Sequence, residues 1–470
     1  MDNNRGKNLA KNTLIITIGR ISTQFISFML LPLYTTLLST EEYGTVDLIT
    51  TLVQLFIPVV SLMIDQGVFR YLLSAETESE KKSIISNAIF VLIGLNLCFL
   101  IIYLLLLPFI SSQYKIWILL ILIATAFSNL FLQIARGLKK TTSYAFGSFV
   151  CSGITIILNI LCIAFIKMGA VGMLIATFGG NVICCVYLFI KLGVKKYVAL
   201  SEINRKIAIN ELKYSIPLVP NQLSLWVMNS SDRLIVSFVL GTAANGLIAV
   251  SYKFPSIFIT FFNIFQLAWH ETGAIHYFDE DRDVFFSEII EKILTLFVTL
   301  CMGIIVVLPI VFNWFVNIAY DEAYFNIPIY LVASLFNVVV GLLGVVYVAT
   351  KRTFEIAKTT MLAAAINIIV NIVLIKYIGL YAASISTLVG YFVTMVYRII
   401  DTKKYLNIQY NCKRYIFIAL EMIICIDIYY LRNKIVSIVM LPIFAVVSIW
   451  LNKNSIDLLK EEVKKKIGKF

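Results

Sequence analysis

The feature that most constrains this chain is a series of long apolar stretches separated by short clusters of charged residues. Of its 470 residues, 60% are hydrophobic and only 14% are charged. Most stretches contain about 20 residues, the length of a helix that crosses roughly 30 Å of hydrocarbon. They do not alternate between apolar and polar residues, as the strands of a membrane β-barrel do. The sequence therefore predicts an all-α integral membrane protein.

The apolar stretches predict about fourteen membrane-spanning helices, each recognised by its length and lack of charge. Their approximate ranges are 12–38, 44–73, 84–110, 115–138, 143–166, 170–192, 214–240, 244–270, 285–312, 325–349, 355–376, 378–399, 411–431 and 435–452. An even number of spans places both termini on the same side of the membrane.

The distribution of Lys and Arg indicates which side that is. Nearly all of these residues fall in alternate segments, beginning with the N-terminus, and few remain in the others. The sparse set comprises Lys115, Lys167, Lys376, Arg432 and Lys434. Since cytoplasmic loops carry the excess of positive charge, both termini are expected in the cytoplasm. The net charge of +12 is thus explained without nucleic acid as a partner.

The longest break between apolar stretches, at 193–213, divides the chain into six predicted helices before it and eight after it, and a weak internal repeat of six helices supports this division. Segment 136–141 (RGLKKT) resembles 348–353 (VATKRT), and 169–177 (GAVGMLIAT) resembles 379–387 (GLYAASIST). Repeats of six helices keep the same orientation, which predicts two lobes related by a pseudo-twofold axis along the membrane normal, with a substrate site between them. The expected parts are an N-lobe at 1–198, a cytoplasmic interfacial linker at 199–213, a C-lobe at 214–400, and two C-terminal helices with a basic tail at 401–470.

Polar residues inside the spans recur at helical spacing, so each set forms one stripe on an otherwise apolar helix. The stripes are Thr13, Thr17, Arg20, Gln24 and Ser27; Asp47, Gln54, Ser61 and Asp65; Gln222, Trp226, Asn229 and Arg233, flanked by Asn221 and Asp232; and Lys253, Ser256, Thr260, Asn263, Gln266 and His270. Such stripes cannot face lipid, so they predict a hydrated cavity with cationic groups.

From these stripes, and from Arg70 near the inner end of the second span, we select candidate site residues. The candidates for substrate binding are Arg20, Gln24, Asn229, Asp232, Arg233, Lys253 and Asn263; those for gating or coupling are Asp65, Arg70 and His270. Each has a structural alternative. Arg20 and Lys253 could reach toward the membrane surface, and Asp232 could form an ion pair with Arg233. Asp65 and Arg70 could be ordinary interfacial charges, and His270 could be solvated.

Motifs for catalysis are essentially absent. The chain has no G-x-S-x-G, no phosphate-binding G-x-x-x-x-G-K-[ST], no H-E-x-x-H and no Cys/His spacing typical of a metal site. The eight cysteines lie mostly within apolar segments. We therefore expect no enzyme activity, no cofactor and no bound metal; energy for transport would come from a coupling ion such as H⁺ or Na⁺, the membrane potential or the substrate gradient.

Several short motifs together resemble the polysaccharide flippase family, the O-antigen and capsule repeat-unit branch of the MOP superfamily, which also contains MATE exporters and lipid II flippases. They are 37–44 (LLSTEEYG), 65–70 (DQGVFR), 214–221 (YSIPLVPN), 229–233 (NSSDR), 240–241, 245–246, 252–253, 266–269 (QLAW), and the stretch from 367 to 379. The resemblance covers nearly the whole chain, and it lies in the order and spacing of degenerate motifs.

The resemblance implies a two-lobed, MATE-like bundle of twelve core helices with two more at the C-terminus, in the inner (cytoplasmic) cell membrane. It also implies a flippase that moves an oligosaccharide repeat unit on an undecaprenyl pyrophosphate carrier from the inner to the outer leaflet by alternating access. Arg20, Arg233 and Lys253 fit the cationic cavity that such flippases use for the pyrophosphate. The implied partners are this lipid-linked oligosaccharide, membrane lipid and the coupling ion. A lipid II flippase and a MATE-type small-molecule antiporter remain alternatives.

Overall fold

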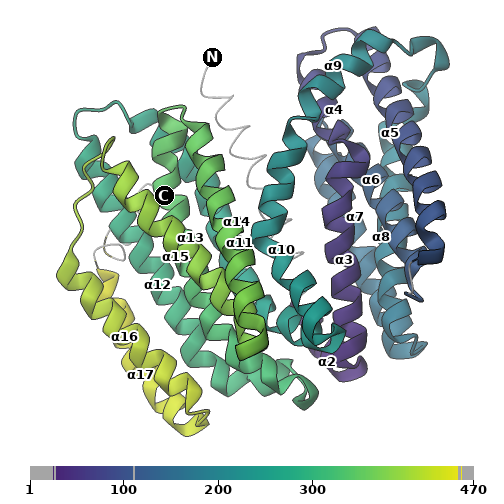
Figure 1. Ribbon diagram of the computed structural model, residues 1–470. Coiled ribbons are helices and arrows are strands. Elements are labelled where there is room, and N and C mark those ends of the chain that lie inside the picture. Colours follow the sequence, from purple (N-terminus) through teal and green to yellow (C-terminus); the bar gives the residue numbers. More distant parts are fainter. Residues whose placement is uncertain (1–24, 26–27, 110–111, 454–456, 458–470) are drawn as a thin grey trace, which may run out of the picture. The chain divides into compact units, whose positions relative to one another are not determined.

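The computed structural model describes residues 25, 28–109, 112–453 and 457, and nearly all of them are helical (Figure 1). The helices are α2 (Leu31–Leu37), α3 (Thr40–Ser61), α4 (Ile64–Ser74), α5 (Glu78–Leu106), α6 (Lys115–Gly137), α7 (Thr141–Asn159), α8 (Gly169–Leu192), α9 (Arg205–Ser215), α10 (Leu218–Leu240), α11 (Thr242–His276), α12 (Arg282–Phe315), α13 (Ile327–Ala349), α14 (Thr353–Ile378), α15 (Tyr381–Thr402), α16 (Cys412–Tyr430) and α17 (Lys434–Leu451). No strand occurs in this part of the chain, which confirms the predicted all-α class.

Eleven helices in the described residues are long and apolar enough to cross a membrane. Three of the fourteen predicted spans are not among them. The first, 12–38, falls largely outside the described residues and ends in α2. The other two are α10, whose polar stripe lowers its hydropathy, and α16, which contains Lys413, Arg414, Glu421 and Asp427. The chain is thus a multi-pass membrane protein.

Large apolar side chains cover the outside of these helices. Exposed examples are Leu105 on α5, Phe149 on α7, Ile369 on α14 and Val446 on α17. A soluble protein does not present so much apolar surface to water, because contiguous exposed patches drive association. Against hydrocarbon the same side chains are solvated by lipid, as the membrane assignment requires.

The chain folds as two compact units, Met1–Gly246 and Leu247–Phe470. The first contains the helices through α10 and the first turn of α11; the second contains the rest of α11 and α12–α17. These units are defined by packing. The predicted lobe boundaries rest on the break at 193–213 and on the sequence repeat, and they stay a prediction.

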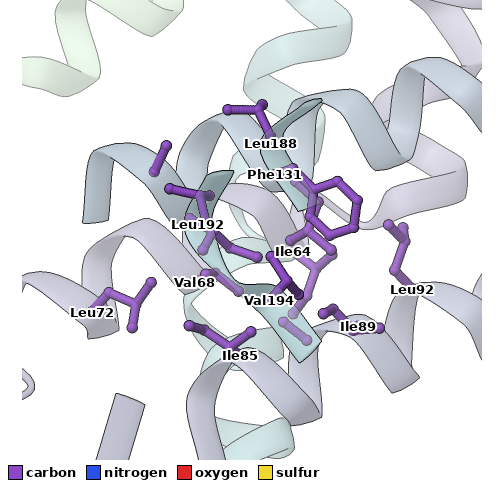
Figure 2. Close-up of a cluster of buried hydrophobic side chains, with 14 of the residues drawn as sticks. Ile64, Val68, Leu72, Ile85, Ile89, Leu92, Phe131, Leu188, Leu192 and Val194 are labelled. Carbon is purple, nitrogen blue, oxygen red and sulfur yellow. The ribbon is translucent and has the colours of Figure 1, made fainter. Parts of the chain in front are cut away.

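The core of the first unit gathers around one face of α4. Ile64, Val68 and Leu72, which lie one turn apart on that helix, are fully or almost fully buried. Figure 2 shows them among apolar side chains of α5, α6 and α8, including Ile85, Leu92, Phe131, Leu188 and Leu192. This packing fixes the rotation of α4, so its other faces are free to line a cavity and to receive α9.

The second unit is organised around α13 and α12. Helix α15 packs along both α13 and α14, and helices α16 and α17 both pack on α12. Charged and polar contacts attach the last two helices: Arg414 forms an ion pair with Glu291 at 2.6 Å, and Arg432 forms one with Asp321 at 2.5 Å. The tyrosines Tyr324 and Tyr429 stack and donate hydrogen bonds to each other's carbonyl oxygens.

The backbone supports the internal repeat. Lys139 and Lys351 occupy matching positions and have φ of 59° and 58°, and the matched glycines Gly169 and Gly379 have φ of 55° and 54°. In both copies the amide that follows the lysine bonds a carbonyl five residues back, Lys140 to Ala135 and Arg352 to Tyr347. Helix α8 packs along α6 and α7 as α15 does along α13 and α14. The two segments therefore share one local fold.

The left-handed lysines allow a stability test. A non-glycine residue in this conformation is strained, and glycine is the residue that helix C-termini favour there. We expect Lys139→Gly and Lys351→Gly each to stabilise the folded state by about 1 kcal/mol, measured as a rise in melting temperature. The control is Lys140→Gly, which removes the same charge at φ −87° and should give no such gain. If Lys140→Gly raised the melting temperature as much as Lys139→Gly, the expectation would be contradicted.

Candidate functional site

A cavity of about 490 Å³ lies within the first unit and is lined by residues of α3, α4, α6, α7 and α10 and of the break between α3 and α4. Its lining is polar for a membrane-embedded bundle. The polar members are Gln54, Asp65, Gln66, Thr125, Asn129, Gln133, Tyr144, Gln222, Trp226, Asn229 and Ser230; the apolar members are Val53, Ile57, Pro58, Met63, Leu132 and Leu225. Six of these side chains are amides, which both donate and accept hydrogen bonds.

A break between α3 and α4 shapes one wall of this cavity. Leu62 and Met63 both have left-handed backbone conformations, with φ of 47° and 55°. The chain is interrupted here inside the predicted second span, and α4 starts again at Ile64. Pro58, one turn earlier, cannot donate an amide hydrogen and weakens the end of α3. Discontinuous membrane helices are typical of transporter binding sites, where the broken backbone lines a polar cavity.

The restarted helix brings an acidic side chain to the cavity. The Asp65 carboxylate accepts a hydrogen bond of 2.6 Å from the side-chain amide of Gln66. Asp65 is the only charged residue among the described residues of the lining. The opposite wall is α6, where Thr125, Asn129 and Gln133 lie one turn apart. The cavity is therefore rich in amides and carries one acid.

Helix α10 closes against the N-terminal half of α3 by specific polar contacts. The indole nitrogen of Trp226 donates to the carbonyl oxygen of Thr51 at 3.0 Å, and both groups are buried. Further along, Arg233 Nη1 lies 2.9 Å from Asp47 Oδ1 in a mostly buried ion pair. The cavity lining on α3 starts at Val53, immediately after these contacts.

The start of α11 meets the start of α3 through two glycines. A Cβ added at Gly44 would lie 1.8 Å from the carbonyl oxygen of Thr242, and one added at Gly246 would lie 2.1 Å from that of Thr40. The fully buried Asn245 donates from its amide to the Gly44 carbonyl at 2.8 Å and to the Asp47 carboxylate at 3.2 Å. Only glycine permits backbones to approach this closely.

The structure places the predicted site residues as follows. Asp65 and Asn229 line the cavity. On α10, Asp232 is buried but not part of the lining, and Arg233 pairs with Asp47. Arg70 is exposed on α4; Lys253, Asn263 and His270 lie on α11 in the second unit; Arg20 and Gln24 lie outside the described residues. Arg233 thus takes Asp47 as its ion-pair partner, although Asp232 precedes it in sequence and its carboxylate accepts the Arg233 backbone amide. The binding roles remain predictions.

Several residues of the cavity are absent from the predicted site. The stripe Thr125, Asn129 and Gln133 recurs every four residues on α6, a signal of the same kind as those used above. Asp47 belongs to a predicted stripe, but its pairing with α10 and Asn245 depends on the tertiary packing. Among the described residues no group of three or more His, Cys, Asp or Glu is arranged to hold a metal ion.

Long apolar helices around a polar, amide-lined cavity define the class: a multi-pass membrane transport protein. The family model described as polysaccharide biosynthesis protein matches residues 9–270, more than half of the chain. The chain therefore belongs to the polysaccharide biosynthesis protein family, and the resemblance drawn from its motifs is confirmed. No curated protein sequence matches the chain.

Solved structures show the same fold. The lipid II flippase MurJ in an inward closed conformation matches with a TM-score of 0.74 and 15% identity, over 95% of this chain and 99% of that one. A multidrug resistance MATE family transporter of the MOP superfamily, in its inward-facing conformation, matches with a TM-score of 0.68 and 15% identity, over 83% of this chain and 98% of that one. At these identities the likeness shows the fold.

The glycine contact between α3 and α11 gives a second test. We expect Gly44→Ala to destabilise the protein by about 1–3 kcal/mol, because the new methyl group overlaps the Thr242 carbonyl and forces the backbones apart. Thermal unfolding of the purified chain measures this. The control is Gly153→Ala on α7, where no described atom lies within 4 Å of the added Cβ. A Gly44→Ala variant as stable as this control would show that the close approach is not maintained.

Proposed function

We propose that this protein is a flippase that moves a polyprenyl-pyrophosphate-linked oligosaccharide repeat unit from the inner to the outer leaflet for surface polysaccharide synthesis. The observation that carries the proposal is the amide-lined cavity in a chain of the polysaccharide biosynthesis family. Capsule or O-antigen is the kind of polymer it would supply. Its expected place is the cytoplasmic membrane, with both termini in the cytoplasm.

The cavity chemistry suits a sugar. Hydroxyl groups of a sugar need partners that both donate and accept, and Gln54, Gln133, Gln222 and Asn229 do both. Trp226 and Tyr144 add flat apolar surfaces with a polar edge. The volume of about 490 Å³ lies within the usual range of ligand sites, roughly 300–1,000 Å³.

The lipid carrier explains why only a polar head group needs a cavity. The polyprenyl tail is as apolar as the bilayer and can remain in it, whereas sugar and pyrophosphate cannot enter hydrocarbon without losing their hydration. In the proposed cycle Arg20, Arg233 and Lys253 bind the pyrophosphate. Because arginine binds phosphate with two parallel hydrogen bonds, the dianionic cargo competes with Asp47 for Arg233.

One observation favours a second candidate. Asp65 is the only charged side chain in the described lining, and an acid in a polar cavity attracts cationic cargo. A MATE-type exporter of small cations is therefore the alternative from a different class of cargo. A lipid II flippase differs from the main proposal only in the identity of the lipid-linked sugar.

Depletion of the protein in its host, followed by mass spectrometry of polyprenyl-linked sugars, tests the proposal. A complete lipid-linked unit should accumulate while the surface polymer is lost, and its mass identifies the cargo.

Complementation with Gln133→Leu or Asn129→Leu should restore little export at normal expression, since the lost amides bind sugar. Asn181→Leu on α8, outside the cavity lining, is the control and should restore export.

Two other results would contradict the flippase proposal. If truncated lipid-linked intermediates accumulate, the protein acts in synthesis of the unit. If neither the lipid-linked pool nor the surface polymer changes on depletion, the exporter of small cations becomes the leading function.

The role of Arg233 can be separated from its structural ion pair. Arg233→Ala should abolish export at normal expression, because it removes the proposed phosphate ligand. Asp47→Asn breaks the same ion pair but keeps the guanidinium, so it should retain export within about tenfold, on the order of one lost charged hydrogen bond. Lys292→Ala, at a surface pair with Glu288, is the control and should export normally. Equal loss in both variants would assign Arg233 a structural role only.

A further inference from the structure

The helix that leads into α10 carries a carboxyl group in an unusual environment. Glu211 on α9 is 0% exposed, and neither of its carboxylate oxygens has a hydrogen-bond partner among the described residues. The sequence predicts this segment as an interfacial linker, in which a glutamate would sit in water. A buried carboxylate without a partner is costly, so the group is held in its neutral, protonated form.

Packing explains the burial. Helix α9 lies against α4 and α5, and its side chains Ile207 and Leu212 pack on the apolar cluster around Ile64 and Val68. Gly67 on α4 makes room for the Glu211 backbone: a Cβ there would lie 2.9 Å from the Glu211 carbonyl oxygen. Glu211 is therefore enclosed at the interface of three helices.

Polar side chains of α5 and α4 hold the linker in place. Ser83 and Asn87 donate to the carbonyl oxygen of Glu202, and Asn87 accepts from the backbone amide of Asn204 at 2.9 Å. The hydroxyl of Tyr71 donates to the carbonyl oxygen of Asn210 at 3.2 Å. The linker is thus docked by bonds to its backbone, and none of these bonds satisfies the Glu211 carboxyl.

Ionisable groups occur nearby on α4, on α5 and on α9 itself, but none of those described bonds Glu211. They are Asp65, Arg70 and Tyr71 on α4; Glu78, Glu80, Lys81 and Lys82 in the first turns of α5; and Arg205, Lys206, Lys213 and Tyr214 on α9 itself, while α10 has no ionisable group before Asp232. Several of these groups bond another residue or are exposed to solvent. Asp65 bonds Gln66, Lys81 bonds Glu78, and Arg70 and Lys213 are exposed.

We propose that Glu211 is a proton-binding site whose occupancy controls the docking of α9 on α4 and α5. When α9 is docked the carboxyl keeps its proton; when α9 leaves, the O–H bond breaks, the proton passes to water, and the carboxylate is hydrated. Since α9 ends at Ser215 and α10 starts at Leu218, a change in α9 acts directly on the helix that carries Gln222 and Asn229. Its use as an ion-coupling site in transport rests on the proposed function; the proton site does not.

The sign of the pH dependence follows from burial. Burial raises the pKa of Glu211 from its ordinary 4.5 to about 9 in the docked state. Below the ordinary value both docked and undocked forms hold the proton, and docking is strongest. As pH rises from there to about 9, the undocked form alone loses its proton, and its share grows about tenfold per pH unit.

Hydrogen exchange of the full chain in lipid nanodiscs tests this without any cargo, so its failure is distinct from failure of the flippase proposal. After correction for intrinsic exchange rates, opening of the amides in 205–215 should increase about 100-fold from pH 6 to pH 8 in the wild type. Glu211→Gln, which mimics the protonated form, should stay as protected at pH 8 as at pH 6. Glu202→Gln removes the same charge from the linker and should behave like the wild type.

A second measurement reads the proton itself. The infrared difference between wild type and Glu211→Gln at pH 7 should contain the carbonyl stretching band of a protonated carboxylic acid. The absence of this band, a flat exchange profile in the wild type, or the wild-type profile in Glu211→Gln would each overturn the proposal.

Discussion

The absence of water from the bilayer core governs where this chain can place its polar side chains. Lipid offers no hydrogen-bond partners, so every polar group in a spanning helix must find one inside the protein or in a hydrated cavity. The contacts between α3 and α10 meet this requirement in sequence: Arg233 binds Asp47, Trp226 binds the Thr51 carbonyl, and the following polar residues open onto the cavity. The cavity thus begins where the polar side chains of α3 and α10 no longer bond each other.

Those parts of the site that depend on periodicity could be predicted from the sequence. The stripes containing Gln54 and Asn229 could be predicted because helical spacing puts polar residues on one face regardless of tertiary packing. The break at Leu62 and Met63 could not be predicted, because neither residue is glycine or proline and both adopt a conformation that only the surrounding fold imposes. The pairing of Asp47 likewise depends on which helix lies beside it.

The linker shows how tertiary packing overrides a local pattern. Its mixture of charged and apolar residues predicts an amphipathic helix at the membrane surface, with its charges in water. The exposed Lys206 and Lys213 follow that expectation, but Glu211 turns into the interface with α4 and α5. The reason is the room beside Gly67, a property of α4 that no pattern within the linker encodes. A charge pattern alone therefore does not predict that this glutamate is buried.

The ion pair of Arg233 also bears on how a flippase with this cavity would release its cargo. A guanidinium with no partner would be costly to bury, and it would bind pyrophosphate too tightly to let it go. Asp47, itself held by Asn245 at 3.2 Å, is the partner to which Arg233 would return when the proposed cargo leaves. In the proposed cycle one charge-assisted bond to Arg233 would replace another, and the Asn245 amide would remain on the Asp47 carboxylate while the cargo is bound. For cargo that must be taken up on one side and given up on the other, such a balanced exchange is more useful than high affinity.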